Sequence, residues 1–273
     1  MTILVTGATG NTGREVVRLL GERGVAWRAA SRATGFDWTG PATFESAVDG
    51  VDAVYLLPPP GVGGRLALLA PLLDAVKQAG VTRLVLLSTS VDGVPGQEEF
   101  HQAVIDAAPE YAILRPSWFM QNFVGTHPTA RGIREHGELR SATGEGRIGF
   151  VHTGDIAAVA VETLLVPDAP NRDYLITGPE ALSYRDVAAL IDEVAAYPVR
   201  FVALTPEQGR ARWASFGLPE QAARFAADLD QRLAEGLEDR VSSTVPDLTG
   251  RPARSLREFV HANQNHWQQE VSA

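Results

Sequence analysis

The chain contains no cysteine, and Lys77 is its only lysine among 24 basic residues. The absence of cysteine excludes disulfides, thiolate metal sites and cysteine nucleophiles. No apolar run approaches the roughly 18 residues that suggest a membrane span. The net charge of −9 gives no indication of a surface for nucleic acid or an anionic membrane. The apolar start at residues 1–5 is too short for a signal peptide, so we expect a cytoplasmic protein.

The first half of the chain alternates between apolar runs and helical patterns. The 273 residues, 45% of them hydrophobic, are enough for a large core in one or two domains. Regular alternation of strand and helix predicts right-handed crossovers and a parallel sheet. The predicted strands are residues 2–6, 25–30, 52–57, 83–88 and 111–114, and the predicted helices are 11–23, 44–48, 66–79 and 98–107.

The pattern changes after about residue 123. Residues 125–149 have little periodicity and are expected to be an irregular loop. Further on, we expect helices at 155–165 and 183–196, N-capped by Asp155 and Ser183, strands at 174–177 and 200–203, and a final helix at 255–267. We therefore assign residues 1–124 and about 150–180 to a nucleotide-binding domain, and about 125–149 and 181–273 to a smaller, mostly helical C-terminal cap.

A glycine turn joins the first predicted strand to the first predicted helix. Its sequence is GATGNTG over residues 7–13. Gly7 can adopt the angles of a tight turn, Gly10 leaves room for a pyrophosphate, and Gly13 lets the helix approach the strand. The free N–H groups at the helix start favour phosphate. The turn predicts a dinucleotide site on a Rossmann-type, doubly wound α/β sheet.

The end of the second predicted strand indicates which dinucleotide is bound. The residue that contacts the adenosine ribose is expected there, and the chain has Ser31 and Arg32 and no carboxylate. An arginine can pair with a 2′-phosphate, so NADP(H) is favoured over NAD(H). Asp37 is the residue that could serve NAD(H) instead. We prefer to interpret residues 36–38, which contain Asp37, as the edge of a third strand that lines the adenine.

Several longer stretches resemble one known family. They are LRPSWFMQNF at residues 114–123, DIA at 155–157, TGPEALS at 177–183 and TGRP at 249–252. With the glycine turn, the chain resembles the NmrA-like atypical short-chain dehydrogenases, including quinone reductases, isoflavone-reductase-like enzymes and festuclavine or agroclavine dehydrogenases. The resemblance implies a seven-stranded parallel sheet, NADP(H), and a substrate pocket beside the C-terminal cap. It also implies that some members sense the dinucleotide without turnover.

The resemblance assigns roles to individual residues. It implies that the glycine turn contacts the pyrophosphate, that Arg32 contacts the 2′-phosphate, and that Asp37 lies on the adenine side. Residues at the ends of the predicted strands 52–57 and 83–88 would border the adenosine and the nicotinamide ribose, respectively. The aromatic segment at residues 118–120 would line the nicotinamide and substrate pocket. These residues are Gly7, Thr9, Gly10, Asn11 and Thr12 for the pyrophosphate, Leu57 and Pro58 for the adenosine, Ser88 and Thr89 for the ribose, and Trp118, Phe119 and Met120 for the pocket.

The usual proton relay of short-chain dehydrogenases cannot exist in this chain. That relay needs a tyrosine four residues before a lysine, but residue 73, four before Lys77, is leucine. The helix that follows Ser88 contains His101, and histidine can donate a proton near neutral pH. We name His101 as the catalytic candidate, and an exposed helix histidine as the alternative. Reduction of an iminium needs no proton donor, so imine, iminium and enone substrates are favoured.

Other polar and aromatic residues are given structural roles. Tyr55 is interpreted as core, His152 as a strand-end residue, and His127 and His136 as surface residues of the irregular loop. The acidic stretch 235–239 is interpreted as a solvated face, and the six histidines show no metal-ligand spacing, so no metal is expected. Residues at helical spacing in the cap are interpreted as core packing and not as a substrate cage, namely Trp213, Phe216, Phe225 and Leu229.

Three functions remain open from the sequence. The first is an NADPH-dependent oxidoreductase that delivers hydride to a small apolar imine, iminium, enone or quinone. The second is a regulator that senses NADP(H) without turnover, and the third is an isomerase or cyclase that retains the nucleotide. The aromatic segment from Trp118 to Met120 favours an enzyme, because a sensor needs no such wall. We expect a small-molecule substrate, no nucleic acid or membrane partner, and a monomer or homodimer.

Overall fold

The computed structural model describes residues 1–58, 65–169 and 171–268. The chain divides into two compact units. Unit 1 comprises Met1–Pro116, Thr153–Ile176 and Ser243–Arg251, and unit 2 comprises Ser117–His152, Thr177–Ser242 and Pro252–Ala273. In the described residues, no helix has both the length and the apolar character that crossing a membrane requires.

Unit 1 is built on a parallel sheet that has six strands within the described residues. Its order is β2-β1-β3-β4-β5-β8, and every neighbouring pair is parallel. Ile3, Leu4 and Val5 of β1 have no exposed surface, as expected for a strand covered on both faces. The strands are β1 (Thr2–Thr6), β2 (Ala26–Ala30), β3 (Ala53–Leu56), β4 (Arg83–Leu87), β5 (Glu110–Pro116) and β8 (Arg172–Ile176).

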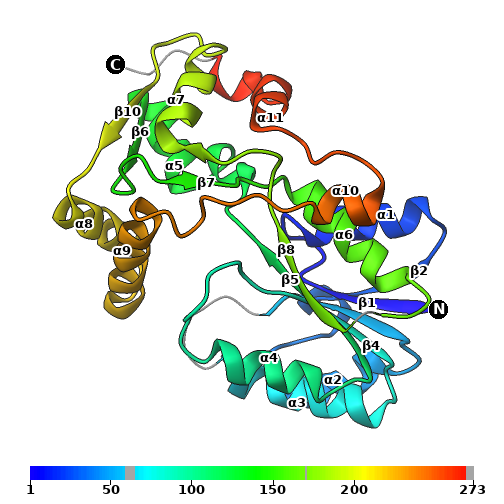
Figure 1. Ribbon diagram of the computed structural model, residues 1–273. Helices are drawn as coiled ribbons and strands as arrows, with labels where there is room; N and C mark the ends of the chain where they lie inside the picture. The colour runs from blue at the N-terminus through cyan, green and yellow to red at the C-terminus, as the bar shows by residue number, and fades with distance from the viewer. Residues whose placement is uncertain (59–64, 170, 269–273) are drawn as a thin grey trace. The chain divides into compact units, whose positions relative to one another are not determined.

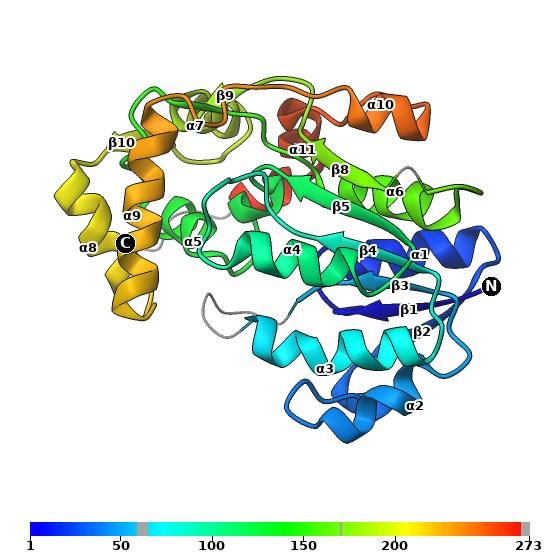
Figure 2. The same cartoon turned by 60° about the horizontal axis from the view of Figure 1, so that its bottom comes forward.

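Helices cover both faces of this sheet, which confirms the doubly wound α/β fold. One face carries α1 (Gly13–Glu22), α6 (Thr153–Leu165) and α10 (Thr244–Thr249) (Figure 1). The other face carries α2 (Phe44–Val48), α3 (Arg65–Gln78) and α4 (Gln97–Ile105), as the turned view in Figure 2 shows. Two short 3₁₀ helices, η1 (Arg32–Thr34) and η2 (Pro41–Thr43), lie between β2 and α2.

A buried arginine fixes the C-terminal end of α6 against the sheet. Arg83 of β4 is 6% exposed, and its Nη1 donates to the carbonyl oxygens of Leu164 at 2.9 Å and Val166 at 2.6 Å. Its Nε donates to Glu110 Oε2 at 2.6 Å. The guanidinium thus satisfies carbonyls that have no partner within the helix, and a carboxylate of the neighbouring strand balances its charge.

Within the described residues, unit 2 contains the remaining helices and two two-stranded sheets. Strands β6 and β10 pair in parallel, and β7 and β9 pair antiparallel. Its core includes edge-to-face contacts of Phe150 with Phe123 and Tyr184, at centroid distances of 5.2 and 5.5 Å. The elements are η3 (Met120–Phe123), α5 (Pro128–His136), β6 (Glu138–Ser141), β7 (Arg147–Ile148), β9 (Leu182–Ser183), α7 (Tyr184–Asp192), β10 (Arg200–Ala203), α8 (Pro206–Ser215), α9 (Glu220–Ala234), α11 (Leu256–Ala262) and η4 (Gln264–Trp267).

Two expectations about secondary structure are wrong. Residues 36–38 form no strand, so the described sheet has six strands and not seven. Instead, Phe36 and Trp38 pack edge-to-face at 5.0 Å, and both lie against Phe44 of α2. Residues 125–149 are not an irregular loop, because they form α5, β6 and β7.

One expectation about acidic residues is also wrong, and another holds only in part. Asp155 is the third residue of α6 and not its N-cap, because the helix begins at Thr153. In the stretch 235–239, expected to be a solvated face, Glu235 and Asp239 are exposed, but Glu238 has no exposed surface. The hydroxyl of Ser117 donates to Glu238 Oε2 at 2.8 Å, and Arg240 forms an ion pair with Oε1 at 2.7 Å. These contacts balance the charge of the buried carboxylate.

The predicted cap at Ser183 is confirmed. Its hydroxyl accepts the backbone N–H of Asp186 at 3.1 Å, and Asp186 Oδ2 accepts the backbone N–H of Ser183 at 2.9 Å. This reciprocal capping box starts α7 at Tyr184.

Candidate nucleotide-binding and proton-transfer site

The glycine turn after β1 has a geometry that requires glycine at its first position. Gly7 has φ +63°, and a Cβ built there would lie 2.4 Å from Leu57 Cδ2. The backbone N–H of Gly10 donates to the Gly7 carbonyl at 2.9 Å, which closes the turn. The left-handed backbone angle would strain any L side chain at residue 7, and a Cβ there would also push the end of the Leu57 side chain aside.

The last glycine sets the distance between α1 and the turn. A Cβ on Gly13 would lie 2.1 Å from the Gly7 carbonyl oxygen and 3.0 Å from Ala8 Cα, so only glycine allows α1 to begin there. The first N–H groups of α1 have no acceptor within the helix. Thr9 and Asn11 are exposed on the turn beside this helix start. The Arg14 N–H already donates to the Gly10 carbonyl at 3.1 Å. A glycine turn that leads directly into the N-terminus of a helix fits a pyrophosphate.

Thr6, which the sequence reading missed, holds the two strands on either side of the turn. It is fully buried at the end of β1. Its Oγ1 accepts the backbone N–H of Leu57 at 2.6 Å and lies 3.1 Å from the Leu57 carbonyl oxygen. Thr6 thus fixes Leu57 where it contacts Gly7. The available signal was a hydroxyl at the end of an apolar strand, immediately before the glycine turn.

Tyr55 lies in the core of unit 1, as expected. It is on β3, paired with Val5 on one side and Val85 on the other, and has no exposed surface. Its hydroxyl is oriented toward Thr12 but makes no hydrogen bond of normal geometry. Burial raises the pKa of Tyr55 above its usual value of 10.0, so the phenol stays protonated and does not act as a base.

Arg32 and Asp37 lie near each other after β2, and both are exposed. The backbone and side chain of Thr39 donate to Asp37 Oδ1, both at 2.9 Å. These hydrogen bonds lower the pKa of Asp37, with a smaller contribution from the charge of Arg32. Within the described part of the chain, the Arg32 side chain has no carboxylate within ion-pair distance. Asp37 is thus engaged by its own turn, and Arg32 is available for an anion.

Ser88 and His101 form a hydrogen-bonded pair at the carboxyl end of β4. Ser88 directly follows the strand, and His101 lies on α4, with Ser88 Oγ and His101 Nε2 2.7 Å apart. Both residues are half-buried. Desolvation is the main cause that lowers the pKa of His101 below 6.5, while Asp173 and Asp92 oppose this effect. The structure therefore brings together two residues that the sequence had singled out separately.

Arg115 supports the loop after β4 that carries Ser88. It lies on β5, and its guanidinium donates to the carbonyl oxygens of Thr89 at 3.2 Å and Ser90 at 3.1 Å. It also pairs with Asp92, and with Asp173 of β8 at 3.6 Å. Sequence reading gave Arg115 no role, although it lies in the LRPSWF stretch. Its function depends on β5 lying beside β4, which a strand prediction alone does not reveal.

The aromatic segment expected to line a substrate pocket belongs to unit 2. The Trp118 carbonyl accepts the N–H of Val151 at 2.8 Å, and the N–H of Met120 donates to the Val151 carbonyl at 3.0 Å. Trp118 and Phe119 are half-buried. Met120 has no exposed surface and packs in the core of unit 2, so it presents no accessible wall to a substrate.

Three further histidines, His127, His152 and His136, lie in unit 2. His127 is the N-cap of α5, and its ring accepts the N–H of Thr129 at 3.2 Å. His152 packs edge-to-face on Phe259 at 5.8 Å, and His136 lines a cavity described below. In residues 1–58, 65–169 and 171–268, no group of three or more histidine or carboxylate side chains is arranged to hold a metal.

The parallel sheet and its glycine cradle define a dinucleotide-binding α/β protein. A family profile described as NAD(P)H-binding matches residues 7–167. An NAD(P)H azoreductase from Xenophilus azovorans is 36% identical over 283 residues, which cover 96% of this chain and 97% of the relative. An agroclavine dehydrogenase from Claviceps fusiformis is 35% identical over 291 residues, which cover 98% of this chain and 99% of the relative.

A solved structure shows the same similarity in three dimensions. The NADPH-dependent quinone oxidoreductase from Escherichia coli, crystallised with NADPH, has a TM-score of 0.81 at 25% identity, covering 95% of this chain and 99% of that chain. The chain therefore belongs to the NAD(P)H-binding family, and it is an NAD(P)H-dependent oxidoreductase. The resemblance to NmrA-like atypical short-chain dehydrogenases is confirmed.

Proposed function

We propose that the protein is an NADPH-dependent reductase that delivers hydride to a small, largely apolar imine, iminium, enone or quinone. The observation that carries the proposal is the Ser88–His101 pair, which lies at the carboxyl end of a strand in the same unit as the glycine cradle. In open α/β sheets, ligands bind at the carboxyl ends of the strands. The names of the similar proteins, an azoreductase, an agroclavine dehydrogenase and a quinone oxidoreductase, support hydride transfer to such groups.

The preference for NADPH is assigned to Arg32. The glycine turn and the start of α1 would hold the pyrophosphate, and the second strand ends immediately before Ser31 and Arg32. A guanidinium free of carboxylates can form two hydrogen bonds with a 2′-phosphate. Asp37, the residue that would favour NADH, already accepts two hydrogen bonds from Thr39. Leu57 and Pro58, both half-buried, would border the adenosine.

Ser88 and His101 supply the proton that the substrate oxygen or nitrogen takes up after hydride transfer. When bound, the reduced dinucleotide would supply the hydride. Ser88 Oγ donates its proton to the substrate oxygen or nitrogen, and protonated His101 replaces that proton through Nε2, which leaves a neutral imidazole. Arg115 holds the loop backbone at Thr89, and it thereby fixes the position of the neighbouring hydroxyl.

This relay predicts different pH profiles for different substrates. Because burial lowers the pKa of His101 below 6.5, the protonated form that completes the relay is the minor form at neutral pH. Reduction of a quinone or an enone should therefore accelerate as the pH falls toward that pKa. Reduction of an iminium adds hydride to a cation and should show no such dependence.

The test follows NADPH absorbance with a quinone, an enone, a cyclic iminium and an aldehyde, with NADH as the cofactor control. We expect turnover of at least one member with NADPH preferred. Arg32→Ala should raise the KM for NADPH about tenfold or more and leave NADH unchanged, because only NADPH carries the 2′-phosphate. The matched control is Arg251→Ala, since Arg251 is another exposed arginine of unit 1.

Each outcome has a distinct meaning. Equal use of NADH and NADPH by the wild-type protein would refute the assignment of Arg32 and return the ribose contact to Asp37. Tight NADPH binding without turnover of any panel member would favour a redox sensor, or an isomerase that retains the nucleotide.

A further inference from the structure

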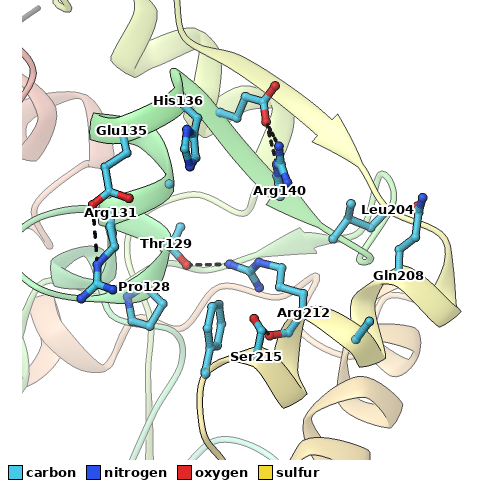
Figure 3. A pocket seen from close by; sticks show the side chains of 14 residues that line it. Pro128, Thr129, Arg131, Glu135, His136, Arg140, Leu204, Gln208, Arg212 and Ser215 are labelled. Atoms are coloured by element: carbon cyan, nitrogen blue, oxygen red, sulfur yellow. Dashed lines mark hydrogen bonds and ion pairs between the residues drawn. The ribbon is translucent and has the colours of Figure 1, made fainter. Parts of the chain in front are cut away.

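Unit 2 contains a cavity of about 480 Å³ that no step of the proposed reaction uses. It lies between α5, β6 and α8, with Pro128 and Thr129 in its lining (Figure 3). Phe216 also lines it. This volume is within the range of ligand pockets for small organic molecules, about 300–1,000 Å³. The lining combines apolar side chains with several arginines.

Arg212 of α8 extends into this cavity toward Thr129 (Figure 3). Its Nη2 donates to Thr129 Oγ1 at 3.2 Å. The guanidinium carbon lies 4.8 Å from the ring centroid of Phe216 and 5.3 Å from that of Trp213. These rings hold the guanidinium by cation–π contact and leave its N–H edge for hydrogen bonding. Arg212 is half-buried, so its charge is partly removed from water.

The other arginines of the cavity are already paired. Arg140 donates from Nε to Glu138 Oε2 at 2.6 Å, and Arg131 lies 3.9 Å from Glu135. Glu138 also pairs with Arg200 through Oε1 at 2.6 Å, so both of its oxygens are occupied. Three arginines therefore face two glutamates in the lining, and Arg212 is the lining arginine without an ion pair among the described residues.

Arg212 has only a neutral hydrogen-bond partner among the residues that the structure describes, although the charge of Asp230 acts on it at longer range. Thr129 Oγ1 is its one hydrogen-bond acceptor there, and no carboxylate lies within 4.0 Å of it. The nearby Asp230 is turned to another donor, because its Oδ2 accepts the indole N–H of Trp213 at 2.7 Å. A half-buried guanidinium with one neutral acceptor retains most of its five donors for a ligand.

We propose that this cavity binds a small organic anion, a carboxylate, sulfonate or phosphate on an apolar body. Arg212 binds the anionic group by charge-assisted hydrogen bonds, and Pro128 and Phe216 contact the apolar part. The site lies wholly in unit 2, and its existence does not depend on hydride transfer.

Calorimetric titration of the intact protein, saturated with NADP⁺ to fill the nucleotide site, tests this proposal. The probe is naphthalene-2-sulfonate, and its uncharged counterpart is naphthalene-2-sulfonamide. We expect the sulfonate to bind at least about tenfold more tightly, because a charge-assisted hydrogen bond contributes that much. Arg212→Gln should weaken sulfonate binding by about tenfold or more and leave sulfonamide binding nearly unchanged.

Two further variants make the result specific. Arg210→Gln removes an exposed arginine of the same helix that does not line the cavity, and should change the affinity by less than about twofold. Ser215→Trp fills the cavity from an exposed lining position, keeps Arg212, and should abolish binding of both probes. If Arg212→Gln does not fold, this variant still decides the question.

Three outcomes would overturn the proposal. They are equal affinity of the wild-type protein for both probes, sulfonate binding that survives Ser215→Trp in a folded protein, and equal weakening by Arg210→Gln and Arg212→Gln. The last would mean that the anion responds to the net charge of α8 and not to the cavity.

Discussion

The carboxylate of Asp230 is predicted to destabilise the folded protein at neutral pH. It lies on α9, is 6% exposed, and accepts a hydrogen bond from Trp213 Nε1 at 2.7 Å. Burial raises the pKa of Asp230 from 3.8 to about 6, although Trp213 and the charge of Arg212 both act to lower it. Asp230→Asn removes the charge but retains an oxygen that accepts from Trp213. We therefore expect this substitution to stabilise the protein at pH 8.

The size of the effect follows from the pKa difference. The rise from 3.8 to about 6 is about 2 units, and each unit corresponds to about 1.4 kcal/mol, which gives up to about 3 kcal/mol. Because the folded pKa is the higher one, the folded state binds the proton more tightly. The destabilisation by Asp230 is therefore complete above pH 6 and fades as the pH falls through 6 toward 3.8. At pH 5 roughly half of it should remain.

Urea unfolding followed by tryptophan fluorescence at pH 8 and pH 5 measures this effect. The matched control is Asp228→Asn on the same helix, where the side chain is exposed, and we expect a change below about 0.5 kcal/mol. Loss of stability in Asp230→Asn at pH 8 would show that Arg212 more than compensates for burial. A gain of equal size at both pH values would show that it does not come from the titration of Asp230.

Two predictions concern the nucleotide cradle and the proton relay. Gly13→Ala places a methyl group 2.1 Å from the Gly7 carbonyl oxygen, so NADPH affinity should fall at least about tenfold in a fluorescence titration. Gly21→Ala on the same helix meets nothing within 4 Å and should bind NADPH normally, and equal loss in both variants would refute the steric argument. Ser88→Ala should lower kcat for a quinone or enone about a hundredfold. It should leave iminium reduction unchanged, and equal losses on both substrates would contradict the relay.

The nucleotide cradle could be predicted because its signals are local in sequence. The strand, the three glycines and the helix lie within the first 22 residues, and each glycine has a geometric reason that the motif itself states. The contact of Leu57 with Gly7 could not be derived in this way, because it depends on β3 lying beside β1. Thr6 holds that contact and was missed for the same reason.

The segment 125–149 was misjudged because its structure depends on distant partners. Strand β6 pairs with β10, and Arg200 of β10 pairs with Glu138 of β6. Each strand has only four residues, too few to show a clear period. The histidines and arginines that made this segment look irregular cap α5, as His127 does, or pair with carboxylates, as Arg140 does.

The Ser88–His101 pair, proposed here to transfer a proton, could be predicted only in part from the sequence, because the pairing depends on how the sheet is built. Ser88 could be placed because it ends a predicted strand, and His101 because it lies on the next helix, but their separation of 2.7 Å needs the crossover between them. Arg115 fixes the intervening loop through backbone carbonyls at Thr89 and Ser90, so its contacts are independent of the side chains there. The position of the Ser88 hydroxyl is therefore determined by the neighbouring strand β5 as much as by the residues of its own loop.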